Sequence, residues 1–191
     1  MPARIAPETP PFSKDIADAL ARIMPHGVPP LVLFTTLARN PRVFQRVMAG
    51  GLLDKGSITL RERELVIDRT TARCGSEYEW GVHIAFFAEW AGLTPAEIAA
   101  IVNGAPDDPL WSPREQLILR LVDSLHETNT AHETLWTALK TEFSDEQLIE
   151  FVVLTGFYHT ISFVTNALAI PLEENAARFA AYQPNSASNT S

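Results

Sequence analysis

The sequence predicts an all-α fold, a compact helical array without a sheet, and three observations support this prediction. No segment alternates between apolar and polar residues with a period of two. Capping boxes of the form Ser/Thr-x-x-Glu begin at Thr59, Thr94 and Ser112, and proline follows the last two at the first helical position. Glycines and a proline supply helix stops between and after these boxes.

These signals divide the chain into a series of helices. A looser capping box begins at Ser144, where glutamine takes the third place. The predicted helices are residues 13–23, 30–38, 41–49, 59–73, 76–91, 95–103, 112–127, 131–142 and 145–169.

The caps also suggest a two-fold half-repeat of a three-helix unit. A capped helix, a helix carrying a histidine and a second capped helix recur in the same order, at offsets of 53, 49 and 50 residues. The first copy begins at Thr59 and carries His83, and the second begins at Ser112 and carries His132. Two such units packed on each other are one interpretation, and ordinary helical punctuation is the alternative.

The chain of 191 residues is long enough for one domain, which we assign to residues 13–180. Residues 1–12 are rich in proline and are expected to be an extended or disordered arm, without the apolar segment of a signal peptide. Residues 181–191 are polar and are expected to be a disordered tail.

The charge and cysteine content exclude several classes of function. The net charge of −8 and the pI near 5.1 argue against nucleic acid or an anionic membrane as a partner. The one cysteine, Cys74, excludes an intramolecular disulfide and an all-cysteine metal site, and it fits a reducing, cytoplasmic location. His126 and His132 are six residues apart and form no His-Glu-x-x-His motif, so we expect neither a metal nor a cofactor.

One segment has the composition of a membrane span. Residues 151–170 contain no acid, lysine or arginine. Six polar side chains within it are unfavourable in lipid, and no basic residues flank it. We therefore expect a helix that is buried on all sides in a bundle or a subunit interface, and no membrane contact.

The candidate chemistry lies between residues 60 and 93. Glu79, His83, Phe86 and Trp90 fall on one helical stripe, and Glu64 on the preceding helix can face the same cavity. A carboxylate and an imidazole are unfavourable to bury for packing alone. The alternatives are a core histidine satisfied by Glu79 and a solvated Glu64 at its helix start.

The segments RERELVIDR and YEWGVHIAFFAEWAGLTPAEIAAI resemble the carboxymuconolactone decarboxylase family, which includes the alkyl hydroperoxidase D-like proteins. The resemblance spans residues 31–170 and is strongest over residues 60–101. It implies an all-helical, cofactor-free protein that assembles as a trimer or hexamer. The peroxidase branch carries Glu-x11-Cys-x-x-Cys-x3-His. Here Ser76 and Glu79 occupy the two cysteine positions, and Cys74 lies two residues from the first.

The decarboxylase branch of the family has no thiols and uses acid/base residues in aromatic compound catabolism. By this resemblance His83 is the expected proton donor, with Glu64 as its orienting or proton-relaying partner. Glu79 departs from the family pattern, but one turn from His83 it would raise the pKa of the histidine, and we count it among the catalytic residues. Substrate contacts are expected from Tyr78, Trp80 and either Arg69 or Arg73. For the two arginines, a solvated helix face paired with Glu62 and Asp68 is the alternative.

The apolar helix near residue 158 is also expected to contribute. In the resembled family this helix lies against the site, so Tyr158 and His159 are expected to close the pocket. A hydrogen-bonded pair in the core is the alternative.

The sequence thus predicts a cofactor-free, carboxymuconolactone decarboxylase-like enzyme, a carboxy-lyase by family type. It is expected to perform decarboxylation or proton transfer on a small unsaturated lactone or carboxylate. One alternative is a peroxidase-related redox protein that uses Cys74. Another is an oligomer that binds a small molecule without turnover.

The uncharged helix predicts self-association, because a monomer of this size does not readily cover so much apolar surface. We expect a dimer, trimer or hexamer in sedimentation velocity at micromolar concentration. A single monomeric species under these conditions would contradict the prediction.

Overall fold

The computed structural model describes residues 3–183, and within them the all-α prediction is confirmed, because this part of the chain contains no strand. Nine α-helices and one short 3₁₀ helix follow in order within these residues. They are α1 (Lys14–Ile23), α2 (Val32–Leu37), α3 (Pro41–Gly50), α4 (Leu60–Arg73), α5 (Glu77–Phe87), α6 (Pro95–Asn103), α7 (Pro113–Thr128), α8 (Glu133–Glu142), α9 (Asp145–Ala167) and η1 (Phe179–Tyr182).

The capping residues determine where the helices begin. Thr59, Thr94, Ser112 and Ser144 all form capping boxes in which each side chain bonds the other residue's backbone. The largest departure from the predicted bounds is α5, which ends at Phe87 rather than near residue 91.

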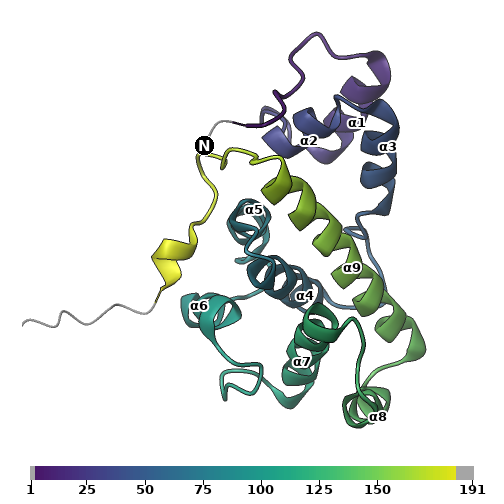
Figure 1. Cartoon of the computed structure of the whole chain (residues 1–191), viewed down its shortest axis with the longest axis vertical. Coiled ribbons are helices and arrows are strands. Elements are labelled where there is room, and N and C mark those ends of the chain that lie inside the picture. The colour runs from purple at the N-terminus through teal and green to yellow at the C-terminus, as the bar shows by residue number, and fades with distance from the viewer. Residues whose placement is uncertain (1–2, 184–191) are drawn as a thin grey trace, which may run out of the picture.

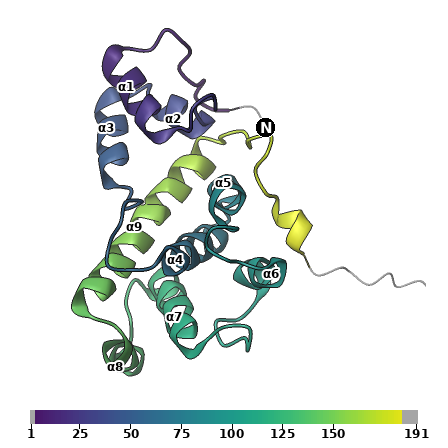
Figure 2. The ribbon, with the colours of Figure 1, turned by 180° about the vertical axis from the view of Figure 1, so that it is seen from behind.

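Helix α4 lies at the centre of the molecule and packs against α5, α6, α7 and α9 (Figure 1). Helices α1–α3 form a separate group at one end, and α8 lies at the other (Figure 2). The long helix α9 connects these two ends. One hydrophobic cluster fills the α4–α9 bundle, and a second lies where α1–α3 meet α5 and α9.

The half-repeat is visible in the order and capping of the helices but not in their dimensions. Helix α6 has 9 residues, whereas its counterpart α9 has 23. His83 lies within α5, but His132 is the N-cap of α8, where its Nδ1 accepts a hydrogen bond from the backbone N–H of Leu135. The repeat interpretation therefore applies only to the helix order.

Helix α9 is long and apolar enough to span a membrane, but 44% of its most apolar window is buried inside the fold. A core helix of a soluble protein passes the same test. The expectation that it is buried on all sides is wrong for the single chain. Ile149 and Phe163 expose about two thirds of their surface, at 65% and 66%, along one outward stripe of α9.

The chain ends, as far as they are described, are attached to the fold. In the N-terminal arm the backbone N–H groups of Arg4 and Glu8 donate to the carbonyls of Leu168 and Thr35. At the other end, η1 places Phe179 against Trp80. Residues 1–2 and 184–191, which include most of the expected tail, lie outside the described residues.

Helix α4 carries an unusual set of buried charges into the interior. Four of its charged side chains expose 7% of their surface or less. They are Glu62, Glu64, Asp68 and Arg69. Burial of an unpaired charge is strongly unfavourable, so each of them needs a partner or a change of protonation state.

The segment after α9 crosses α5 at a glycine. The N–H of Ala177 donates to the carbonyl of Gly81, and a Cβ at position 81 would lie 2.3 Å from the carbonyl oxygen of Ala177. Any side chain here would displace the crossing segment, because the obstructing atom belongs to the backbone.

We expect Gly81→Ala to reduce the free energy of unfolding by about 1–3 kcal/mol through overpacking. Gly156→Ala is the matched control, because a Cβ at this position of α9 meets nothing within 4 Å. It should raise stability by about 0.5–1 kcal/mol through helix propensity. Urea denaturation measures both, and equal effects of the two substitutions would contradict the crossing described here.

Candidate active site

A cavity of about 650 Å³ lies between the α1–α3 group and the helices α5 and α9. Its walls are mainly apolar, and the polar side chains are few. The apolar walls include Leu33, Phe34, Val47, Met48, Val82, Phe86, Phe87, Phe157 and Ile161. The ionisable or hydroxylated side chains that line it are Asp54, Glu79, His83 and Tyr158.

His83 is the centre of this polar group. Its Nδ1 lies 2.8 Å from Oε2 of Glu64, which is fully buried on α4. Its Nε2 lies 3.1 Å from the hydroxyl of Tyr158 and 3.6 Å from Oε1 of Glu79. The structure thus brings together the three predicted catalytic residues, Glu64, Glu79 and His83, and adds Tyr158 to them.

The turn between α4 and α5 sets this geometry. Gly75 has a φ of +62°, a left-handed conformation that favours glycine, and it lets α5 fold back along α4. Ser76 then begins α5, and its buried hydroxyl is 2.7 Å from that of Thr165 on α9. Glu64 and His83, 19 residues apart, consequently face each other across two helices.

The two carboxylates keep His83 charged. Burial alone would lower its pKa, but Glu64 and Glu79 outweigh burial and raise the pKa of His83 to about 10. Burial, reinforced by the same two carboxylates, raises the pKa of Tyr158 well above its usual range. At neutral pH the site therefore holds an imidazolium and a neutral phenol.

Asp68, one turn after Glu64 on α4, is a site residue that the sequence reasoning missed. It is buried, neither carboxylate oxygen has a hydrogen-bond partner among the described residues, and its donor atoms lie within 4.8 Å of those of Glu64 and His83. Burial and the nearby Glu64 raise the pKa of Asp68 well above its usual range. The sequence offered one signal for Asp68: it lies four residues after Glu64, and the residues between them are apolar.

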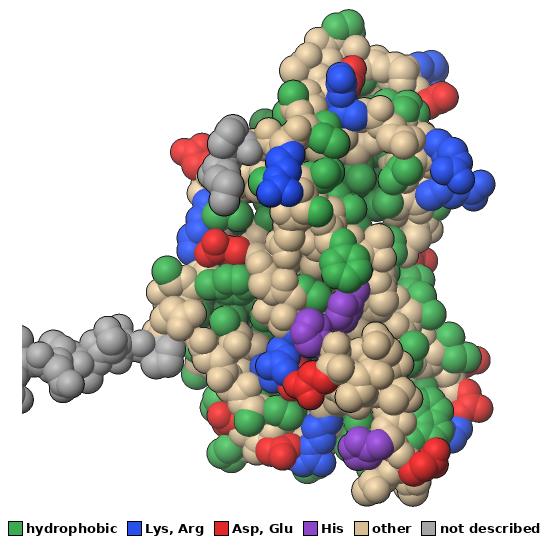
Figure 3. All heavy atoms as spheres, in the orientation of Figure 1, with side chains coloured by type: hydrophobic (Ala, Val, Ile, Leu, Met, Phe, Trp, Pro, Cys, Tyr) green, Lys and Arg blue, Asp and Glu red, His purple; other side chains and the backbone are tan. Residues whose placement is uncertain are grey.

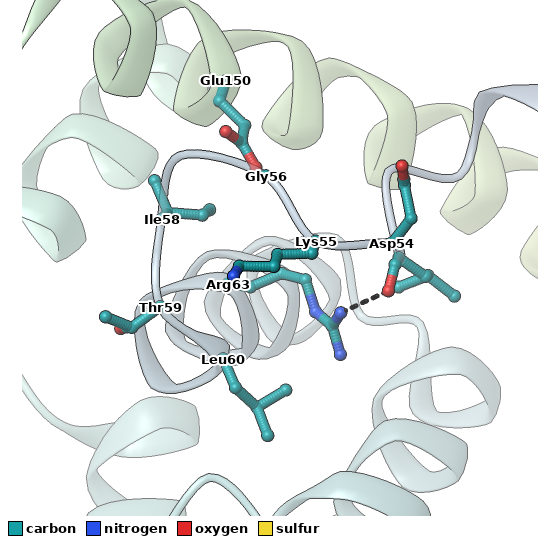
Figure 4. A pocket seen from close by; sticks show the side chains of 9 residues that line it. Asp54, Lys55, Gly56, Ile58, Thr59, Leu60, Arg63 and Glu150 are labelled. Carbon is teal, nitrogen blue, oxygen red and sulfur yellow. Dashed lines mark hydrogen bonds between the residues drawn. The ribbon is translucent and has the colours of Figure 1, made fainter.

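Arg63 lines a smaller hollow of about 280 Å³ beside the loop before α4 (Figure 4). Its guanidinium donates to Glu64 and to the carbonyl of Leu53, and it lies 5.4 Å from the centre of the Phe87 ring. The arginine therefore supports Glu64 from the side opposite His83 and does not line the main cavity.

The two arginines expected to bind substrate do not line the cavity. Arg69 forms two hydrogen bonds with the carboxylate of Asp123, at 2.8 and 2.7 Å, and also donates to the carbonyl of Ile101. Arg73 pairs with Asp123 and Glu127. Both arginines connect α4 to α7 through ion pairs. Their partners are not the Glu62 and Asp68 of the solvated-face alternative, and Arg69 is buried.

Several aromatic candidates also lie elsewhere. The hydroxyl of Tyr78 accepts from the N–H of Leu33 and donates to Glu173. Trp80 is completely buried on another face of α5, against η1. Trp90, expected on the stripe of His83, lies beyond the end of α5 with 80% of its surface exposed.

His159 and Cys74 both lie outside the cavity lining. His159 donates from Nδ1 to the carbonyl of Thr155 and points away from the polar group of His83, toward His126. Cys74 is the half-buried C-cap of α4, and burial raises the pKa of its thiol. A raised thiol pKa is unfavourable for the redox alternative, since the thiolate is the reactive form.

Several solved structures share this architecture at low sequence identity. An AhpD-core, uncharacterized peroxidase-related protein from Ralstonia eutropha JMP134 superposes with a TM-score of 0.77 at 20% identity, covering 91% of this chain and 94% of that one. An uncharacterized peroxidase-related protein from Silicibacter sp. TM1040 gives a TM-score of 0.80 at 16% identity, with 93% and 96% covered. The debrominase Bmp8 in complex with 2,3,4-tribromopyrrole gives 0.73 at 12% identity, with 92% and 94% covered.

These likenesses establish an AhpD-like all-helical fold for the chain. Residues 40–123 match the model of the carboxymuconolactone decarboxylase family. The family resemblance drawn from the sequence is thereby confirmed. No curated protein matches the sequence.

We expect the His83 side chain to remain protonated between pH 6 and pH 9 in NMR titration, because two carboxylates raise its pKa to about 10. Glu64→Gln should lower this pKa, since it removes the larger of the two carboxylate contributions. Tyr158→Phe is the control, because it removes a hydrogen bond but no charge. A His83 side chain that titrates near its ordinary value of about 6.5 in the wild type would contradict this assignment.

Asp68 gives a second pH-dependent prediction. Because its folded-state pKa is raised, its contribution to stability is complete below about pH 4 and is lost as the pH rises through the folded-state pKa. The side chain introduced by Asp68→Asn cannot ionise, so the variant does not lose stability in this way. The stability of the variant relative to the wild type should therefore increase as the pH rises from 4 to 8. Thermal unfolding across this range measures the difference, and a difference independent of pH would contradict the assignment.

Proposed function

We propose that the protein is a cofactor-free acid/base enzyme that transfers a proton to or from a carbon atom of a small, largely apolar carbonyl compound. An unsaturated lactone is one such compound. The observation that carries this proposal is the position of the His83 side chain, between the carboxylates of Glu64 and Glu79 at the wall of an apolar cavity.

His83 and Tyr158 can act together on a substrate oxygen. A protonated imidazole donates from both nitrogens, so Nδ1–H is directed to Glu64 and Nε2–H to the Tyr158 oxygen. The Tyr158 hydroxyl hydrogen is then available to donate to a carbonyl oxygen in the cavity. This donation would stabilise the negative charge that develops as an enolate forms.

Glu79 is the candidate base. Its carboxylate lines the cavity and lies 3.6 Å from Nε2 of His83. It can accept a proton from the carbon next to the carbonyl, and return of this proton to another carbon of the enolate completes an isomerisation. The same conjugated system could accept the electron pair released when CO₂ leaves, and decarboxylation would then end with proton delivery to carbon.

The charge of the cavity favours proton transfer over decarboxylation of a dicarboxylate. Among the residues that line it, within the described part of the chain, there is no lysine or arginine, while Glu79 and Asp54 are acidic. The two arginines that could have neutralised a dianion are paired with acids on α7. The charges around the cavity therefore favour a substrate that is neutral or carries a single carboxylate.

The test is deuterium incorporation from D₂O into a panel of neutral unsaturated lactones and enones, followed by NMR and mass spectrometry. Glu79→Gln and His83→Gln should each reduce exchange by about 100-fold or more, as for loss of a general acid or base. Glu89→Gln, which changes an exposed acid beyond the end of α5, is the matched control.

Tyr158→Phe separates this mechanism from simple binding. We expect exchange to fall by about 100-fold with little change in KM, because the hydroxyl acts mainly on the developing charge. Full exchange activity in Glu79→Gln, or in His83→Gln, would overturn the proposal.

A further inference from the structure

A second cluster of reactive side chains lies outside the cavity, where the end of α4 meets α7 and α9. Cys74 Sγ is 3.8 Å from Nδ1 of His126, and this same nitrogen is 3.0 Å from Nε2 of His159. The three donor atoms all lie within 4.8 Å of one another, and all three residues are half-buried. Figure 3 shows two adjoining histidine side chains on the outer face of the molecule.

We propose that Cys74, His126 and His159 form a binding site for one divalent metal ion of the Zn²⁺ type, separate from the cavity that contains His83. One thiolate and two imidazoles are donors that Zn²⁺ accepts, with a fourth position left for water or another ligand.

The separations between donor atoms fit this ion. With Zn–S near 2.3 Å, Zn–N near 2.05 Å and tetrahedral angles, sulfur and nitrogen should be about 3.6 Å apart and the two nitrogens about 3.3 Å apart. The observed separations are 3.8 and 3.0 Å. These two pairs therefore need a movement of only about 0.2–0.3 Å to reach tetrahedral separations. The third pair, Cys74 Sγ and His159 Nε2, lies within 4.8 Å and must close to about 3.6 Å.

The tautomer of His159 is also the one that a metal requires. Its Nδ1–H donates to the backbone carbonyl of Thr155 at 2.9 Å, so its Nε2 carries a lone pair directed toward His126. A hydrogen bond from the far ring nitrogen to a backbone carbonyl is the usual support of a metal-bound histidine.

The charges around the cluster permit a cation. Burial and the neighbouring His159 lower the pKa of His126, which favours its neutral, ligating form. Arg73, the nearby cation, is paired with Asp123 and Glu127. Burial raises the pKa of Cys74, so metal binding must displace a proton from the thiol and should weaken as the pH falls.

The test uses the full-length protein after removal of metal with a chelator. Calorimetric titration with Zn²⁺ should show one ion per chain, and Co²⁺ should produce thiolate-to-cobalt charge-transfer absorption. Cys74→Ser should abolish that absorption, and His126→Gln and His159→Gln should each weaken Zn²⁺ binding at least tenfold. His132→Asn is the matched control, because it replaces a histidine that caps α8 with another good capping residue.

A second measurement uses the wild-type protein, so its result does not depend on whether the variants fold. Zn²⁺ should protect Cys74 from alkylation by iodoacetamide at one equivalent per chain. The absence of both thiolate absorption and protection would overturn the proposal. So would Zn²⁺ binding of unchanged affinity in Cys74→Ser, which would place the ion elsewhere, for example at Glu64, Asp68 and His83.

Discussion

The arrangement of this protein depends on the charged side chains that α4 carries into the interior. Each buried charge needs a partner of opposite sign or a change of protonation state, and the partners hold the surrounding helices in place. Arg69 fixes α7 through Asp123, and Glu64 fixes α5 through His83. Asp68 has no such partner, and its raised pKa favours the neutral acid. Unpaired, any of these charges would be strongly destabilising in the core.

Because the buried Glu64 needs a counter-ion, His83 has two roles. It is the counter-ion of Glu64 in the core, and it presents its other nitrogen to Tyr158 and Glu79 at the cavity. The same Coulomb attraction that stabilises the buried pair keeps the imidazole charged at neutral pH. Replacement of His83 is therefore expected to affect stability as well as activity, which is why the pH titration of the intact site is the more direct measurement.

Much of the fold could be predicted from the sequence, because caps and stops are local: the boxes at Thr59 and Ser112 begin helices where expected. Glu64 and His83 were also identifiable from the family motif, and Glu79 from its helical spacing to His83. Helical spacing does not show which neighbouring helix a side chain meets. Arg69 consequently could not be distinguished from a substrate ligand, because its partner Asp123 lies 54 residues away. The contacts between Cys74, His126 and His159 depend likewise on the packing of three helices.

The walls of the cavity come from two different parts of the chain. The segment that matches the family, residues 40–123, contains α4 and α5 and with them Glu64, Glu79 and His83. Helices α1, α2 and α9, which supply Leu33, Phe157 and much of the remaining wall, lie outside it. The pair of Glu64 and His83 and much of the apolar wall are thus carried by separate stretches of sequence, and Tyr158 of α9 comes with the wall. Substitutions in α1, α2 and α9 can therefore change the shape of the cavity while Glu64 and His83 keep their contact.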